Sequence, residues 1–346
     1  MPTTSIKEVA QRAGVSIGTV SNVLNRPNLV APATRQRVLD AIGQLGYVRN
    51  DSARQLRAGR SRTIAIVVLD VANPFFADVV RGAEMEAEKV GGVVVVCNSG
   101  EDPTRERRHL DILEEQRVQG VLITPVHDGP DSRLEQLIAR GTPVVLVDRG
   151  SGHHNRCSVA VDDVLGGRLA AAHLREQEHT SIAYVGGPAS LRQVADRQAG
   201  AASAIGADGE LRVIETATLS VAAGRRAAGE IADLPARQRP TAVFCANDLL
   251  ALGVLQEMTQ RGVRVPRDIA IVGYDDIEFA AAAAVPLSSV RQPREQLGRT
   301  ATQLLLDEIN DHGRHQHRHV VFQPELVVRE SSSRPYRRPA RATARG

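Results

Sequence analysis

Apolar positions at the start of the chain follow helical spacing in three short segments. Residues 6–25, IKEVAQRAGVSIGTVSNVLN, contain two apolar stripes that are separated by a turn at Gly14, and Ser16 can cap the second helix with its side-chain oxygen. A third amphipathic helix is predicted over residues 32–45 and begins with proline at its first position. The pattern therefore predicts a three-helix domain whose second helix presents a polar outer face.

From residue 63 onward, continuous apolar runs alternate with helical patterns. The runs are IAIVV (64–68), VVVVC (93–97), VLIT (121–124), PVVLV (143–147), SIAYV (181–185), RVIET (212–216), TAVFC (241–245) and IAIVG, which ends at Gly273. Such runs indicate parallel strands that are buried on both faces, so the predicted class is α/β. The pattern restarts near Val159, which predicts two similar doubly wound parallel-sheet subdomains, followed by a last strand over residues 320–326.

Positive charge is concentrated at the two ends of the chain. Residues 1–62 hold ten basic and three acidic side chains, a formal +7, whereas the whole chain carries +3. A basic helical module of this kind suits a DNA backbone, and its helix-turn-helix pattern predicts a DNA-reading domain. A small helical hairpin at a domain edge is the alternative.

Residues 50–62, NDSARQLRAGRSR, place four arginines around a single apolar residue, Leu56. The segment is too short and polar to form a stable helix alone, so it is expected to order on a partner. Insertion into a base step of the minor groove would give Leu56 an apolar environment. An ordinary interdomain linker is the alternative.

Three of these motifs, AGVSIGTVSNVLN, ATRQRVLDAIGQLGY and SARQLR, resemble the lactose-repressor (LacI/GalR) family of bacterial transcription regulators, and the resemblance covers almost the whole chain. It implies a core like that of the periplasmic sugar-binding proteins. The implied parts are a helix-turn-helix domain at 1–49, a hinge helix at 50–62, a ligand-binding and dimerisation core at 63–330 (N-subdomain about 63–158 plus 291–318, C-subdomain about 159–290 plus 319–330) and a disordered basic tail at 331–346.

The resemblance also implies which residues contact operator DNA. The implied set comprises Ile17, Gly18 and Asn22 on bases, Ser16, Thr19, Ser21 and Asn25 mostly on phosphates, Leu56 as the minor-groove wedge, and Asn50 and Ala53 along the hinge side of the groove. Many members carry arginine where this chain has Asn22, and a larger or polar residue at Gly18. Asparagine favours adenine or a phosphate rather than guanine, so the operator sequence is less predictable than DNA binding itself.

Polar and aromatic residues collect where the predicted strands end, which is where ligands bind in such sheets. By motif position, the implied effector site consists of Asn73, Phe75, Phe76, Arg149, Arg197, Asn247 and Asp275, with Asp70 and Gln193 as weaker candidates. Arginine, asparagine and aspartate can bond paired hydroxyls, and a phenylalanine face can stack on a sugar, which favours a sugar or a sugar derivative. Purine-binding relatives use the same Phe position and Asp275, so a nucleobase remains the alternative.

Several of these residues could have a role in the fold in place of a role in ligand binding. Arg197 could form a salt bridge between subdomains, Asp248 is expected to cap the helix that follows it, and only one of the two adjacent phenylalanine rings is expected to face the cleft. Glu178 stands where the family usually has glycine, so the turn there is not expected to need a left-handed conformation.

Motifs for metal binding and catalysis are incomplete or absent in the sequence. Four histidines, His312, His315, His317 and His319, lie in a polar connection, but no neighbouring carboxylate or cysteine completes a coordination geometry, so no metal site and no cofactor are predicted. The chain has no GxSxG, P-loop or HExxH motif, which argues against an enzyme. Its three cysteines are few and are expected to be unpaired core residues in a reducing compartment.

The start of the chain lacks an apolar signal segment, and no run approaches 18 apolar residues, so a cytoplasmic protein without membrane contact is expected. These observations predict a homodimeric repressor of carbohydrate-use genes that binds a palindromic operator and is released by a sugar-type effector. A purine- or nucleoside-responsive repressor is the alternative within the family. A solute-binding protein without regulatory DNA binding is the alternative from another class, although such a protein would lack residues 1–62.

Overall fold

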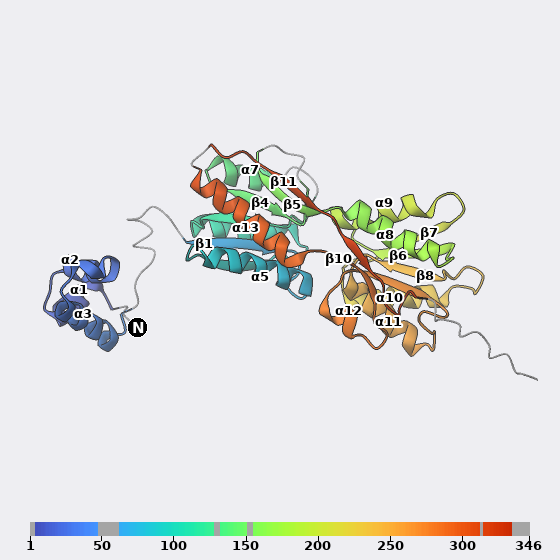
Figure 1. Ribbon diagram of the computed structural model, residues 1–346, viewed down its shortest axis with the longest axis horizontal. Helices are drawn as coiled ribbons and strands as arrows, with labels where there is room; N and C mark the ends of the chain where they lie inside the picture. The colour runs from blue at the N-terminus through green and yellow to red at the C-terminus, as the bar shows by residue number, and fades with distance from the viewer. Residues whose placement is uncertain (1–3, 48–61, 128–131, 151–154, 312–313, 334–346) are drawn as a thin grey trace, which may run out of the picture. The chain divides into compact units, whose positions relative to one another are not determined.

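The structure is a computed structural model that describes residues 4–47, 62–127, 132–150, 155–311 and 314–333. The chain divides into two compact units, residues 1–61 and 62–346, and each is described by itself (Figure 1). In the described part of both units, no helix has the length and apolar character needed to cross a bilayer.

The first unit is a three-helix domain with α1 (Ile6–Ala13), α2 (Ile17–Asn25), a short 3-10 turn η1 (Pro27–Leu29) and α3 (Pro32–Leu45). The Ser16 hydroxyl accepts a hydrogen bond from the Thr19 backbone N–H at 3.1 Å and so caps α2. Each helix contributes one fully buried valine to the core, namely Val9, Val20 and Val38. The helix-turn-helix prediction is therefore confirmed.

The second unit begins with a six-stranded parallel sheet in the order β11-β5-β4-β3-β1-β2. Its strands are β1 (Thr63–Val68), β2 (Val93–Asn98), β3 (Gly120–Ile123), β4 (Val144–Val147), β5 (Cys157–Val161) and β11 (His319–Phe322). The helices α6 (Pro103–Glu115) and α7 (Ser132–Ala139) pack on one face, and α5 (Pro74–Glu88) and α13 (Arg294–Asn310) pack on the other. We call this layer structure the N-subdomain.

The C-subdomain repeats this plan with the sheet order β12-β10-β9-β8-β6-β7, in which only β12 runs antiparallel to its neighbour among the described strands. Its strands are β6 (Ser181–Gly186), β7 (Glu210–Glu215), β8 (Ala242–Cys245), β9 (Ala270–Asp275), β10 (Ser288–Arg291) and β12 (Glu325–Val327). Its helices are α8 (Asp163–Glu176), α9 (Arg192–Ile205), α10 (Val221–Asp233), α11 (Asp248–Gln260) and α12 (Glu278–Ala282). The α8–α9 and α10–α11 pairs lie on opposite sides of the sheet (Figure 1).

The predicted strand over residues 320–326 is wrong, because the chain changes sheets within it. Residues 319–322 form β11, which pairs with β5 in the N-subdomain, whereas residues 325–327 form β12, which pairs with β10 in the C-subdomain. Pro324 lies between them and cannot donate a ladder hydrogen bond. The expected subdomain boundaries shift accordingly, since β5 also extends the N-subdomain to Val161.

The turn after α8 also differs from expectation, because Glu178 adopts a left-handed φ of 65°. Its backbone N–H donates to the Arg175 carbonyl at 2.9 Å, and the N–H of His179 donates to the Leu174 carbonyl at 3.1 Å. Such helix-closing bonds need a left-handed residue at this position whether or not it is glycine.

Three helix pairs of the second unit cross at facing glycines. A Cβ added to Gly224 of α10 would lie 2.2 Å from the Leu250 carbonyl oxygen, and one added to Gly253 of α11 would lie 2.1 Å from that of Val221. The pairs α8–α9 and α5–α13 meet in the same way, at Gly167 with Gly200 and at Gly82 with Gly298. The helices therefore approach each other at backbone contact, which only glycine permits.

Candidate effector cleft and DNA-reading helix

A cavity of about 30 Å³ lies where the carboxyl ends of the strands in the two subdomains meet. It is lined by Leu69, Asn73, Phe75, Phe76, Asp148, Leu191, Gln193, Val194, Arg197, Leu219, Asn247 and Asp275. Six of the seven residues in the implied effector site are thus brought together, although they are far apart in sequence. Arg149 is the exception and does not line the cavity.

The wall from the N-subdomain is built at the start of α5. Asn73 caps this helix, because its Oδ1 accepts a hydrogen bond from the Phe75 N–H at 3.0 Å. Its Nδ2 donates to Asp275 Oδ2 at 3.3 Å and so links the two subdomains. Phe75 and Phe76 pack edge to face with their ring centroids 5.0 Å apart, and both residues line the cavity. The expectation that only one of them faces the cleft is therefore wrong.

Arg197 of α9 is the central cation of the cleft and is only 4% exposed. Its Nε donates to Asp163 Oδ1 at 2.7 Å, and its Nη1 donates to the Ala246 carbonyl at 2.7 Å. The guanidinium carbon lies 3.8 Å from the centroid of the Tyr274 ring, in a cation–π arrangement. Arg197 therefore forms a buried salt bridge within the C-subdomain and lines the cavity as well.

Asn247, not Asp248, caps α11. Its Oδ1 accepts the Leu250 N–H at 2.9 Å, and its Nδ2 donates to the Leu219 carbonyl at 3.1 Å. A cap must lie outside the helix with extended backbone, as Asn247 does, whereas Asp248 is the first helical residue. The Asp248 carboxylate instead accepts from the Ile277 N–H at 2.8 Å and the Ser289 hydroxyl at 2.7 Å, which holds the loop after β9.

Asp148, and not its neighbour Arg149, lines the cavity. Gln193, a weaker candidate, donates from Nε2 to the Asp148 carbonyl at 2.9 Å and to its Oδ2 at 3.0 Å, which is a second link between the subdomains. Arg149 does not line the cavity, and it donates from Nη1 to the His127 carbonyl at 3.0 Å. Both residues directly follow the apolar run PVVLV (143–147), and the sequence does not show which of the two neighbours faces the cleft.

The cleft holds more buried carboxylates than cations. Burial raises the pKa of Asp148 to about 8 and that of Asp275 to about 6, and it also raises the pKa of Asp163, although Arg197 opposes each shift. Two buried acceptor atoms of residues that line this cavity, Asp148 Oδ1 and Gln193 Oε1, have no hydrogen-bond partner within the described structure. Buried polar atoms normally have partners, so these acceptors indicate a place for a ligand that carries hydrogen-bond donors.

Stability is expected to fall with rising pH through Asp275. The ordinary aspartate pKa of 3.8 rises to about 6 in the fold, so the folded state retains a proton that the unfolded chain loses. The stabilisation that comes from this retained proton is therefore fully present below pH 3.8 and is lost as the pH rises through about 6. Between pH 3.8 and about 6 the unmodified protein should lose on the order of 1–3 kcal/mol of unfolding free energy through this group, and Asp275→Asn should not show that loss.

Urea unfolding of Asp275→Asn and the unmodified protein at several pH values measures this effect, and Asp208→Asn, at an exposed position, is the control. Parallel stability profiles for the Asp275→Asn and unmodified proteins would contradict the assignment.

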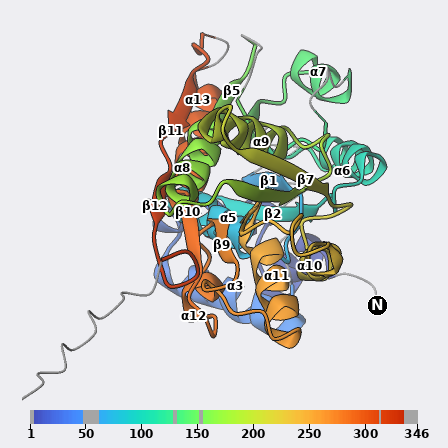
Figure 2. The same ribbon diagram turned by 90° about the vertical axis from the view of Figure 1, so that its right-hand side faces the viewer.

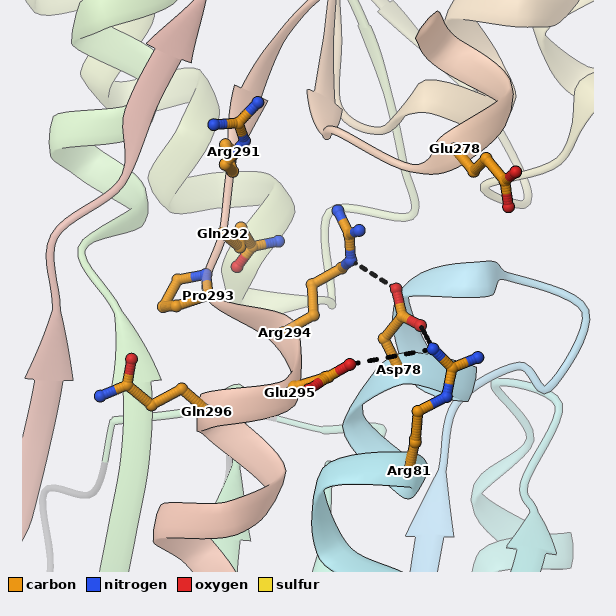
Figure 3. A pocket seen from close by; sticks show the side chains of 9 residues that line it. All are labelled: Asp78, Arg81, Glu278, Arg291, Gln292, Pro293, Arg294, Glu295 and Gln296. Atoms are coloured by element: carbon orange, nitrogen blue, oxygen red, sulfur yellow. Dashed lines mark hydrogen bonds and ion pairs between the residues drawn. The ribbon is translucent and has the colours of Figure 1, made fainter. Parts of the chain in front are cut away.

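A larger cavity of about 530 Å³ lies beside the crossover into α13 (Figure 3). Its charged side chains bond one another: Arg294 contacts Asp78 at 2.8 Å, and Arg81 contacts Asp78 at 3.4 Å and Glu295 at 3.8 Å. None of the implied effector residues lines it. Because six of the implied effector residues line the smaller cavity and none lines the larger one, the smaller cavity is the better candidate for the effector site.

The outer face of α2 is the candidate DNA-reading surface. Ile17, Gly18, Asn22 and Asn25 are exposed along it, and Ser16 is exposed just before the helix. Thr19 and Ser21 are half-buried; the Ser21 carbonyl accepts a hydrogen bond from Asn25 Nδ2 at 2.9 Å. Ile17 offers an apolar surface suited to a thymine methyl group. Asn50, Ala53 and Leu56, which the resemblance assigns to the minor groove, lie outside the described residues.

Both units of the chain match known protein families. Residues 5–50 match the lacI family of bacterial regulatory proteins, and residues 171–332 match the periplasmic binding protein-like domain. The HTH-type transcriptional repressor PurR of Aliivibrio fischeri (strain MJ11) is 36% identical over 333 residues, which cover 94% of this chain and 98% of that protein.

Two solved structures resemble the full chain. The complex of the transcriptional regulator CelR with cellobiose is 34% identical with a TM-score of 0.69, and the alignment covers 95% of this chain and 99% of that one. The Lac repressor dimer bound to operator and the anti-inducer ONPF is 28% identical with a TM-score of 0.79, again over 95% and 99% of the two chains. The chain therefore belongs to the LacI family of bacterial regulatory proteins, and it is a DNA-binding transcriptional repressor that responds to a small-molecule effector and is not an enzyme.

Proposed function

We propose that this repressor controls carbohydrate-use genes, binds a palindromic operator as a homodimer, and is released by a sugar-type effector. The observation that carries the proposal is the pair of unpartnered acceptors that line the cleft, Asp148 Oδ1 and Gln193 Oε1. A sugar offers many hydroxyl donors to such acceptors, and Phe75 and Phe76 offer an apolar surface to its C–H face. The likeness to CelR, which was solved with cellobiose, supports the same ligand class.

A nucleobase is the second candidate, because its N–H groups can also donate to Asp148 and Asp275. Among its lining residues, the cavity has aromatic rings only from α5, and the apolar residues from α9 and the turn before it, Leu191 and Val194, are aliphatic. Leu219 is aliphatic as well. A flat base would therefore lack a second aromatic face, which favours the sugar.

The proposed mechanism follows from the closed state of the cleft. A volume of about 30 Å³ equals the share of one water molecule in the liquid, so a sugar can enter only when the subdomains separate. The links to be broken are Asn73–Asp275 and Gln193–Asp148. Ligand binding would then favour a different tilt between the subdomains, pivoting near residues 162, 292 and 323, where the chain crosses between the sheets.

Fluorescence polarisation with DNA from the region upstream of its own gene tests this function, at fixed salt and against a panel of sugars and nucleobases. We expect tight binding that one sugar relieves, and scrambled DNA of the same length is the control. Relief by a nucleobase alone would replace the sugar with the second candidate. No relief by any ligand, or tighter binding in its presence, would contradict release by an effector.

The proposed homodimer requires an interface, and β2 offers one. This edge strand and the end of α5 expose Met85, Val90, Val93, Val95 and Val96 by 41–62%. An exposed apolar edge strand invites pairing with another chain, and a second copy would bury these side chains. Two linked headpieces then bind an operator much more tightly than one, because the second binds within the same complex.

Val95→Glu is expected to produce monomers and to weaken operator binding by roughly 100-fold or more. Sedimentation velocity and polarisation measure the two effects. The matched control is Val321→Glu on β11, a valine that is also exposed (54%, against 42% for Val95) on the opposite edge strand of the same sheet, which should change neither. A dimeric Val95→Glu protein would contradict this interface.

We also propose a cytoplasmic location, because a transcriptional repressor must act where the bacterial chromosome lies.

A further inference from the structure

A cluster of potential metal ligands forms at the end of the N-subdomain sheet that is opposite the effector cleft. It consists of Cys157 at the start of β5, Glu308 near the end of α13, and His315 and His317 just before β11; their ligand atoms all lie within 4.8 Å of one another. The C-terminal end of α13 and the first residues of β5 and β11 lie in the same region of the N-subdomain in both views (Figures 1 and 2). The sequence around the histidines predicts no metal site, because no neighbouring cysteine or carboxylate completes a coordination geometry there, but the pairing of β11 with β5 brings Cys157 to them.

The distances within the cluster approach those of a tetrahedral site. Cys157 Sγ lies 3.1 Å from His315 Nε2 and 3.9 Å from His317 Nδ1, and the latter atom lies 3.8 Å from Glu308 Oε2. Zinc bond lengths of about 2.0–2.3 Å place tetrahedral ligand atoms roughly 3.3–3.8 Å apart. Small side-chain rotations would therefore bring all four atoms onto one ion.

The surroundings of the cluster suit a bound cation. Cys157 is fully buried, and the backbone N–H of Arg318 donates to its Sγ at 3.3 Å, as expected around a metal-bound thiolate. Glu308 Oε2 is a buried acceptor without a hydrogen-bond partner in the described structure. A metal ion would supply that partner.

We propose that Cys157, Glu308, His315 and His317 bind one Zn²⁺ ion. One sulfur, two nitrogens and one oxygen form a donor set of intermediate softness, which zinc accepts in tetrahedral geometry. Four protein ligands leave no open position, so the site is structural. It would join the end of α13 and the edge strand β11 to β5, and thereby brace the segment that continues from β11 into the C-subdomain.

Cobalt substitution of the full chain, stripped of metal with a chelator, tests the site. We expect one Co²⁺ per chain, visible bands of tetrahedral intensity and a thiolate-to-cobalt charge-transfer band, all displaced by Zn²⁺. Cys157→Ser should lose the charge-transfer band, and His315→Ala, His317→Ala and Glu308→Gln should each weaken binding roughly tenfold or more. The matched controls, Cys97→Ser and His319→Ala, remove a thiol and an imidazole outside the cluster and should bind as the unmodified protein does.

Thermal unfolding gives a second readout, since a ligand that binds only the folded state raises its melting temperature. At one Zn²⁺ concentration, the melting temperature should rise as much in both controls as in the unmodified protein, and clearly less in Glu308→Gln and His317→Ala. Cobalt binding without a charge-transfer band, or equal affinity in the cluster variants and the controls, would overturn the proposal and indicate adventitious binding to other histidines.

Discussion

Arg197→Met is expected to destabilise the second unit by about 3–5 kcal/mol and to abolish the response to effector. Arg197 bonds the buried Asp163, and it is the cation that opposes the raised pKa values of Asp148 and Asp275. Methionine fills a similar volume but leaves these carboxylates without their counter-charge. Urea unfolding measures the stability, and polarisation with operator DNA measures the response.

The matched control is Arg192→Met, one turn and a half earlier in the same helix. Arg192 forms an exposed ion pair with Asp196 at 2.8 Å, and such pairs contribute only about 0–1 kcal/mol. A similar loss of stability in both variants would show that the buried pair does not carry the difference. An Arg197→Met protein that responds normally to effector would contradict the placement of the ligand at this side chain.

Gly224→Ala is expected to destabilise the second unit by about 1–3 kcal/mol, although alanine is the better helix former. Its Cβ would lie 2.2 Å from the Leu250 carbonyl oxygen, so α10 and α11 would have to move apart. Gly229→Ala in the same helix is the control, because its Cβ would meet only the end of the Arg261 side chain at 3.3 Å.

The control should gain up to about 1 kcal/mol from helix propensity. Opposite signs for the two alanines in urea unfolding would establish that backbone contact between helices holds this layer together. Equal effects would contradict it.

The local elements of the fold were predictable from sequence. The limits of α2 and α3 agree with the periodicity and the capping residues, since both signals lie within the helix or next to it. The strand β10 was missed because its buried residues Ser288 and Ser289 are polar and give no apolar run. The sheet change at Pro324 depends on pairing between strands that are distant in sequence, which periodicity does not report.

The candidate sites were also predictable only as far as local sequence determines them. Motif position identified most of the residues that line the cleft, but not the choice between Asp148 and Arg149, which depends on how the chain leaves β4. The cluster around Cys157 could not be predicted from spacing, because Cys157 and His315 lie 158 positions apart and meet only when β11 joins the sheet.

The central claim is that one ligand in the cleft controls operator binding. Its most direct test is to measure the operator Kd with and without the relieving sugar, and the sugar Kd with and without operator, at one salt concentration. If the cleft and α2 are coupled through one equilibrium, the ratio of the two operator Kd values must equal the ratio of the two sugar Kd values. In Arg197→Met the coupling should be lost, so that the sugar no longer changes the operator Kd. A sugar that binds with the same Kd whether or not operator is present would contradict this coupling.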